Sequence, residues 1–222
     1  MDTISAGVTV SAYLTAEGEF GNADLAQAVT EKIAYREGIG DTLAEGVARC
    51  HDELGVENWT MKGLEFAAHD GRVCHGQGLS YAVANLGADH RYASVLALEY
   101  MGDLPPEGLD GKAKHVVARE NLMAFIDSGV VCSFSDAVDA IDKERYEQLL
   151  GAAFEDLMAV GARTVERERH FHNERGRDRS HDDALPYDLP GFEQALDEYY
   201  ELRGWTQNGE VPEDAIESAP IG

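Results

Sequence analysis

Apolar residues recur at helical spacing along most of this chain, and this periodicity limits the folds open to it. The clearest example begins at an expected N-cap, Asp142, and carries one continuous apolar face. That face consists of Tyr146, Leu149, Leu150, Ala153, Phe154, Leu157 and Met158. The helix is expected to continue through Val165 into residues 166–175, whose alternating charges suit a solvated face. We find no internal repeat and no useful strand alternation, so the fold is predicted to be mainly α.

Other segments carry their own helix signals. Residues 22–36 have an apolar stripe and are followed by the stop residues Gly38 and Gly40. A second helix is expected to start at a capping box of Thr42 and Glu45 and to end at Gly55. Further helices are expected over residues 80–86, over 112–126 and from 192 to a stop at Gly204, with a mobile acidic tail from Glu210. Together these signals predict one packed helical unit with a division near Asp70.

The charge balance excludes two classes of partner. The chain has 222 residues, of which 42 are acidic and 18 basic, so its net charge is -24. Such a surface repels nucleic acid and anionic membranes, and we expect direct binding to neither. In concentrated salt the Debye length falls to roughly 3 Å, which would screen this self-repulsion. The composition therefore suggests a halophilic source, with an ordinary acidic cytosolic protein as the alternative.

The three cysteines predict a reducing compartment. Cys50, Cys74 and Cys132 are odd in number and far apart, which does not suit a disulfide framework. The chain also lacks an apolar run of membrane-spanning length and the basic start of a signal peptide. We therefore expect a soluble, cytoplasmic protein. Cys50 lies on an apolar helical stripe and is expected in the core.

One short stretch places two polar reagents in a turn. Residues 126–132 follow a helix-forming segment and put Asp127 five residues before Cys132. A thiolate is a soft ligand for iron or zinc, and an ionised carboxylate accepts charge-assisted hydrogen bonds from ring amines or amides. A helix end with a buried cysteine is the alternative, which residue type alone favours.

Three other groups of residues were weighed as sites. The glycine-rich run 70–79 precedes a helix and could let a ligand approach its N-terminus, but it matches neither a dinucleotide fingerprint nor a P-loop. His90, in the polar stretch 85–91, is either a catalytic group or a surface or core residue. His170, His172, His181, Asp182 and Asp183 match no zinc spacing, so solvated polar groups are the default for them.

Seven separated stretches together point to one family. They are Asp2–Gly7, Tyr35–Asp41, Lys62–Glu65, Gly76–Ala82, Asn85–His90, Asp127–Cys132 and Leu196–Trp205. They occur in the same order in aldehyde ferredoxin oxidoreductases, and the chain resembles that family over nearly its whole length. Members bind a tungsten or molybdenum bis-pterin and a [4Fe-4S] cluster. They oxidise aldehydes to carboxylic acids, with water supplying the oxygen and ferredoxin taking the electrons.

The resemblance implies roles for four residues. Cys132 resembles the last of four cluster ligands, and Asp127 resembles the carboxylate that holds one pterin. Asp2 resembles the last residue of the companion pterin motif, and His90 resembles the histidine near the metal, where it would donate or accept a proton. The implied fold is multi-helical, with residues 1–70 as the remainder of a middle helical domain and 71–222 as a C-terminal helical domain.

The chain departs from the family pattern in two ways. The family has Asp-x-x-Gly-Leu-Cys, whereas here Gly129 comes one place early and Val130 stands at the glycine position. A β-branched residue resists positive φ, so we expect this turn to be altered. The Cys-x-x-Cys-x-x-x-Cys triplet and the N-terminal cofactor-carrying domain are also not in this sequence.

Two functional hypotheses follow, with a third of lower standing. In the first, the chain is the C-terminal portion of an aldehyde oxidoreductase and needs an N-terminal cofactor-carrying polypeptide, since one thiolate cannot hold a [4Fe-4S] cluster. Ferredoxin and a small aldehyde would then be its partners. In the second, it is a helical remnant or interaction protein without cofactor. The third is a zinc or iron module built from Cys74, His75 and the histidines at 170–181.

Overall fold

The computed structural model describes residues 1–130, 132 and 143–217. As predicted, this part of the chain is mainly α, and one short hairpin is its only sheet. The helices are α1 (Thr3–Ala16), α2 (Ala23–Tyr35), α3 (Ile39–Leu43), α4 (Val47–Leu54), α5 (His75–Val83), α6 (Leu96–Met101), α7 (Ala113–Ser128), α9 (Lys143–Leu150), α10 (Phe154–Asn173), α11 (Arg179–Asp182), α12 (Phe192–Arg203) and α13 (Glu213–Glu217). The strands β1 (Thr60–Met61) and β2 (Leu64–Glu65) pair antiparallel.

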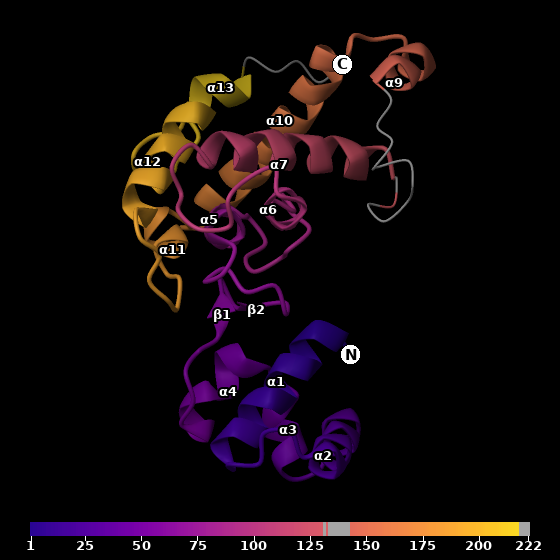
Figure 1. Cartoon of the computed structure of the whole chain (residues 1–222), viewed down its shortest axis with the longest axis vertical. Coiled ribbons are helices and arrows are strands. Elements are labelled where there is room, and N and C mark those ends of the chain that lie inside the picture. Colours follow the sequence, from indigo (N-terminus) through magenta and orange to yellow (C-terminus); the bar gives the residue numbers. More distant parts are fainter. Residues whose placement is uncertain (131, 133–142, 218–222) are drawn as a thin grey trace.

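Helices α1 to α4 form the lower part of the molecule in Figure 1 and have a core of their own. The predicted helix at 22–36 is confirmed as α2, with the Asn22 side chain accepting from the Leu25 backbone N–H at 3.0 Å. Val29 and Ile33 point into the core, which also contains Cys50, as expected. Apolar periodicity and an N-cap therefore located this element correctly.

The single helix expected from the Thr42 capping box is instead two, α3 and α4. Gly46 separates them with a φ of 84°, and the Glu65 carboxylate accepts from the Val47 backbone N–H at 3.0 Å. A Cβ at Gly46 would lie 2.7 Å from that carboxylate oxygen. Thr42 is therefore inside α3 and caps nothing, because a carboxylate distant in sequence supplies the cap of α4. Gly55 ends α4 in the left-handed conformation, as predicted.

The hairpin lies between the lower helices and the upper group, as Figure 1 shows. Met61 and Phe66 pack with Tyr81, Ala82 and Ala88 in one small core cluster. This cluster joins residues from both sides of the division expected near Asp70.

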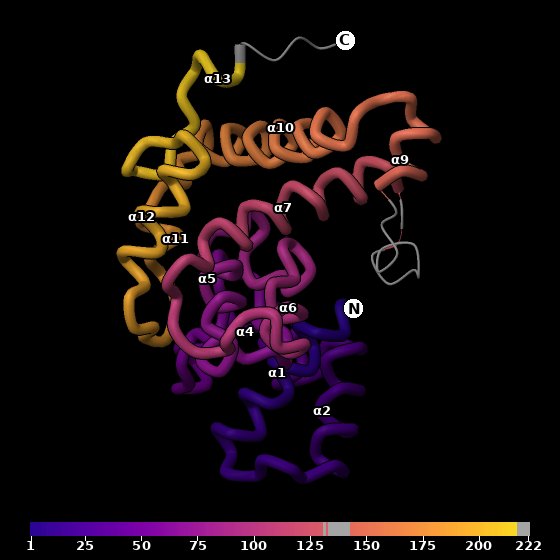
Figure 2. The backbone as a smooth tube through the Cα atoms, turned by 45° about the horizontal axis from the view of Figure 1, so that its top comes forward, coloured from indigo at the N-terminus to yellow at the C-terminus, as the bar shows by residue number. Residues whose placement is uncertain are grey.

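The upper group is organised around α7, which packs against α5, α10 and α12. Helices α7 and α10 run side by side in opposite directions in Figure 2, and α12 crosses near the start of α7. Gly161 allows the close approach of α10, since a Cβ there would lie 1.9 Å from the Asn121 carbonyl oxygen. The helix predicted from residue 192 to Gly204 is confirmed as α12, which a left-handed Gly204 ends, and the short α13 follows it.

The long helix predicted from residue 142 onward is also two helices. Gly151, with a φ of 66°, ends α9, and α10 begins at Phe154. Leu149 is 79% exposed, so the predicted continuous apolar face does not form; the expected N-cap, Asp142, lies outside the described residues. The extension through Val165 is confirmed, because α10 reaches Asn173. Its charged end is not fully solvated, however, since Arg169 is buried.

Helix α5 begins at His75 and ends at Val83, rather than spanning residues 80–86. Its N-terminus does not face a ligand, because the Glu99 carboxylate accepts from the backbone N–H groups of Gly76 at 2.8 Å and Gln77 at 3.2 Å. The Lys112 ammonium donates to the same buried carboxylate. The glycine-rich run therefore makes room for an internal ion pair, and the Glu99 carboxylate occupies the helix N-terminus that a ligand could otherwise approach.

The start of the acidic segment after α12 packs against the rest of the protein, although its composition predicts a mobile tail. Val211 is buried, and its backbone N–H donates to the Asn173 side chain at 3.1 Å. The expectation of a mobile tail from Glu210 is therefore wrong as far as Val211. No helix within residues 1–130, 132 and 143–217 is long and apolar enough to cross a membrane.

Candidate functional site

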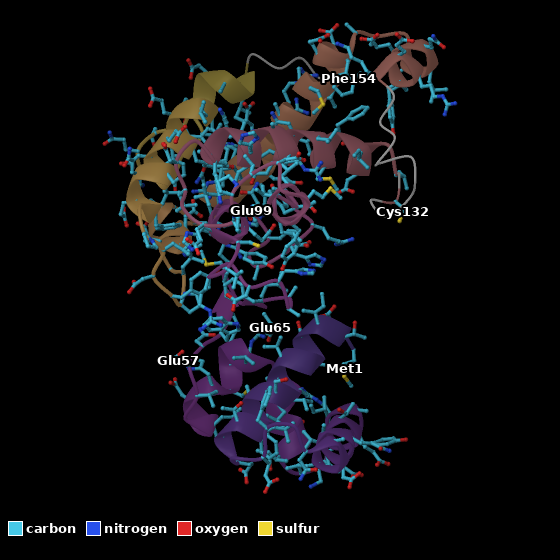
Figure 3. All side chains as sticks on the ribbon, viewed as in Figure 1. Met1, Glu57, Glu65, Glu99, Cys132 and Phe154 are labelled. Carbon is cyan, nitrogen blue, oxygen red and sulfur yellow. The ribbon has the colours of Figure 1, made fainter. Side chains whose placement is uncertain are left out.

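The four residues expected to serve cofactor and substrate come from three places in the fold. Asp2 precedes α1, His90 lies in the loop between α5 and α6, and Asp127 and Cys132 lie at and beyond the end of α7. Figure 3 labels Met1 at the start of α1 and Cys132 beyond α7, on the same side of the view. Across the described residues, no hydrogen bond or ion pair joins two of these four, so the candidate site consists of separate segments.

The end of α7 differs from the turn expected at Asp127. Asp127 and Ser128 still belong to the helix, and Gly129 continues in a right-handed conformation at φ -83°. Val130 then takes φ 55° and donates its backbone N–H to the Asp127 carbonyl at 2.9 Å. Valine thus adopts the left-handed conformation that glycine would enter without strain. The helix-end alternative is confirmed for the backbone of Asp127.

The Asp127 side chain is exposed beside an acceptor-rich hollow of about 270 Å³ between α7 and α10. Glu120 and Glu168 also line it, and Tyr92 donates its hydroxyl to Glu168 at 2.8 Å. Carboxylates that only accept hydrogen bonds suit ligands that present N–H donors. The donor set of a pterin, an amino group and ring N–H groups, fits this chemistry.

Cys132 is an exposed free thiol, whereas Cys50 and Cys74 are buried. The expectation of a buried cysteine at residue 132 is therefore wrong. An accessible thiolate suits an iron ligand. A [4Fe-4S] cluster needs four ligands, and no group of three or more His, Cys, Asp or Glu side chains within the described ranges could hold a metal. Cys132 therefore fits a cluster only together with ligands from outside the described residues.

Asp2 already has a structural role. Its Oδ1 accepts from the Ser5 backbone N–H at 2.7 Å and caps α1, and this hydrogen bond lowers the pKa of the Asp2 carboxyl. The carboxyl is exposed and ionised at neutral pH, so it can also accept from a ligand. The cap orients the side chain at the N-terminal end of α1.

His90 sits in a loop held against the hairpin. Gly87, at φ 108°, approaches so closely that a Cβ would lie 2.2 Å from the Met61 carbonyl oxygen. Asn85 secures the start of this loop, because its side chain donates to the Tyr92 hydroxyl at 2.8 Å and its carbonyl accepts from Arg177 at 2.8 Å. His90 is half-buried, and burial lowers its pKa, so the imidazole is neutral at pH 7 and able to accept a proton.

The alternative zinc or iron module does not form among the described residues. Cys74 is buried, and His75 accepts from the Gly108 backbone N–H at 2.9 Å. His181 instead completes a capping box with Asp178. The structure gathers no metal-binding group from these histidines.

A buried ion cluster escaped the sequence-based reasoning. The Asp182 carboxylate, 0% exposed, receives the Lys62 ammonium at 2.7 Å, the Arg169 guanidinium at 2.8 Å and the Tyr200 hydroxyl at 2.5 Å. Asp182 is thus neither a metal ligand nor solvated. No local pattern in the sequence indicates this cluster, since its members come from the hairpin, α10, α11 and α12.

Helix α1 has an unusual surface for so acidic a chain. None of its residues is charged, and only Thr9, Val10 and Leu14 are buried. Two open hollows of about 590 and 500 Å³ flank it and share Val8, Ser11 and Trp59. Much of this uncharged helix therefore remains uncovered in the chain alone.

The chain is similar to known proteins over nearly its whole length. A family model described as aldehyde ferredoxin oxidoreductase, domains 2 & 3, matches residues 1–219. The tungsten-containing aldehyde ferredoxin oxidoreductase of Pyrococcus furiosus is 33% identical over 91% of this chain and 37% of its own length. The protein of the same name from Thermococcus kodakarensis is 31% identical over 100% of this chain and 43% of its own. The chain thus spans about two fifths of the length of these relatives, and it belongs to the aldehyde ferredoxin oxidoreductase family.

Proposed function

We propose that this chain forms the C-terminal portion of a tungsten-dependent aldehyde oxidoreductase that converts small aldehydes to carboxylic acids. Electrons would leave through a [4Fe-4S] cluster to ferredoxin, in the cytoplasm of a halophilic organism. The observation that carries the proposal is the match of residues 1–219 to domains 2 & 3 of this family. Because the chain spans only two fifths of its relatives, activity would require an N-terminal cofactor-carrying polypeptide.

The exposed surface of α1 supports this requirement. A charge-free helix flanked by two open hollows is costly to leave in water, and such patches mark interaction sites. An uncharged face also avoids the repulsion that a net charge of -24 imposes elsewhere on an approaching acidic partner. We therefore assign this face to contact with the N-terminal polypeptide.

Each of the four candidate residues would have a role that suits its chemistry. Asp127 and Asp2 would accept hydrogen bonds from pterin N–H donors, and the Cys132 thiolate would ligate one iron. A bound tungsten pterin would supply the centre at which an oxygen atom from water joins the aldehyde carbon and two electrons leave. Neutral His90 would accept the proton released as the oxygen of water becomes part of the acid. Molybdenum is the alternative metal.

Co-expression tests the proposal directly. The full chain would be produced with and without a cofactor-carrying family polypeptide from the same source, then purified anaerobically and analysed for tungsten, molybdenum, iron and sulfide. We expect stoichiometric metal and aldehyde-dependent ferredoxin reduction only in the co-expressed complex. A metal-free chain that binds no such polypeptide would refute the proposal and favour a non-catalytic remnant.

Cys132→Ser within that complex tests the ligand role. The variant should lose iron-sulfur absorbance or change the cluster's potential, because a hydroxyl replaces a thiolate on iron. Ser128→Ala is the matched control, since Ser128 also lies at the exposed end of α7 and its hydroxyl donates to the Ala124 carbonyl. Equal spectra in wild type and Cys132→Ser would rule out the ligand role.

A further inference from the structure

A second histidine packs against His90. The ring centroids of His69 and His90 lie 4.8 Å apart at an interplanar angle of 51°. Both side chains are half-buried. The backbone of His69 is fixed, because the Tyr81 hydroxyl donates to its carbonyl at 2.9 Å. Two imidazoles from separate segments are thus brought together and held.

His69 also has an open side. It lines a hollow of about 170 Å³ together with Trp59, Phe66 and Tyr187. Asp70 and Arg72 pair with each other at the rim of this hollow, with a shortest N–O distance of 2.6 Å. His69 therefore borders this hollow and also contacts the ring of His90.

The remaining charges around His90 are few. Its own loop supplies Asp89 and Arg91, which have opposite effects on its protonation and lie 3.6 Å from each other. From the segment after β2 comes His69, whose charge opposes a proton on His90. After burial, His69 has the largest influence on the pKa of His90.

We propose that His69 is a positioning residue for His90: the contact between the two rings opposes a proton on His90, so that His90 stays neutral and ready to accept a proton. Two cationic imidazoles in contact repel each other, and such coupled groups titrate as a pair. The proposal rests on the role assigned to His90 in aldehyde oxidation. It adds the residue that sets the pH at which that role is available.

Nuclear magnetic resonance of the histidine rings in the full chain tests the coupling without any cofactor. The His90 signals would be assigned with His90→Gln and followed from pH 4 to 9 in wild type, His69→Phe and His69→Arg. Phenylalanine keeps a ring against His90 but removes the charge, so the His90 midpoint should rise. Arginine keeps a permanent charge, so the midpoint should fall below that of His69→Phe.

His51→Phe is the control, since His51 lies on α4 and pairs with Asp52. It should leave the His90 midpoint unchanged. His69→Gln provides a second neutral variant in case the larger ring disturbs folding. Identical His90 midpoints in wild type and a folded neutral variant would overturn the proposal.

The two proposals fail separately. If His90 shifts as expected but the co-expressed complex has no activity, the pair stands and the proposed function falls. If the complex oxidises aldehydes and its acid pH limb is the same in wild type and His69→Gln, the pair falls and the function stands. If both proposals hold, the acid limb of the pH–rate profile of the active complex should lie at higher pH in His69→Gln than in wild type.

Discussion

Lys62 shows how a single side chain joins the parts of this molecule. Its ammonium donates to the carbonyls of Ala82 and Ala84, each at 2.7 Å, and pairs with Asp182 at 2.7 Å. The residue takes φ 53° in the hairpin turn, and its side chain is 2% exposed. One cation thus ties the hairpin to the end of α5 and to α11.

Lys62→Met should lower the unfolding free energy by about 3 kcal/mol, because it leaves buried carbonyls without a donor and Asp182 with one fewer cation. Chemical denaturation of the full chain would measure this loss. The matched control is Lys114→Met on the exposed side of α7, which should change stability by less than about 0.5 kcal/mol. Equal losses in the two variants would show that the Lys62 contacts do not stabilise the fold.

The stability difference between wild type and Lys62→Met should depend on pH. Burial lowers the pKa of Lys62 from 10.5 to about 8, against the attraction of Asp182. Between these two values the unfolded chain binds more protons at this residue than the folded chain does, so its contribution to stability rises with pH. The stability gap between wild type and Lys62→Met should therefore widen from about pH 8 to 10.5. A constant gap across this range would contradict the depressed pKa.

Residue chemistry could be read from the sequence only where a family pattern carried it. Residue type singled out Asp127, Cys132 and His90 as candidates, but Asp2 and the specific role of each of the four came from the resemblance, and these roles remain predictions. His69 and Asp182 carried no such pattern. Charged and polar residues are exposed by default, and a single sequence does not say which distant segments will bury them together. Pairing across the fold therefore had to come from the structure.

At the scale of elements, helix positions were predictable and helix breaks were not. Apolar spacing located α2, α10 and α12, because each buries a stripe of its surface, whereas α7 was located by residues that favour helix. Gly46 and Gly151 each interrupt a predicted helix with positive φ. Helical periodicity continues across a glycine in the sequence even where the backbone turns, so these breaks leave no mark in the apolar pattern.

Two glycines inside helices should respond oppositely to the same substitution. Gly161→Ala places a Cβ 1.9 Å from the Asn121 carbonyl oxygen and should lower stability by about 3 kcal/mol by forcing α10 away from α7. Gly7→Ala on α1 meets no atom within 4 Å and should raise stability by up to about 1 kcal/mol through helix propensity. Thermal unfolding of both variants tests this, and a neutral Gly161→Ala would mean that the two helices pack less closely.

For the whole molecule, two surface features should respond to salt: the net charge of -24 and the uncharged surface of α1. Self-repulsion among acidic side chains favours expansion, and salt screens it. Salt also strengthens apolar association, which would favour covering the α1 face. Concentrated salt should therefore stabilise the fold and promote docking of a partner at α1.

Substitution of acidic residues separates the effect of charge screening on stability from that of apolar association. We expect the denaturation midpoint of the chain to rise steadily between 0.1 and 2 M KCl, because the Debye length falls from about 10 Å to below 3 Å over that range. A variant with Glu31→Gln, Glu174→Gln and Glu201→Gln, all at exposed positions, carries three fewer negative charges, one on α2, one directly after α10 and one on α12. It should be more stable than wild type at 0.1 M and gain less from added salt, so that the two curves converge. Parallel curves would assign the salt effect to apolar association instead, and a midpoint that does not change with salt would refute the halophilic interpretation of the charge.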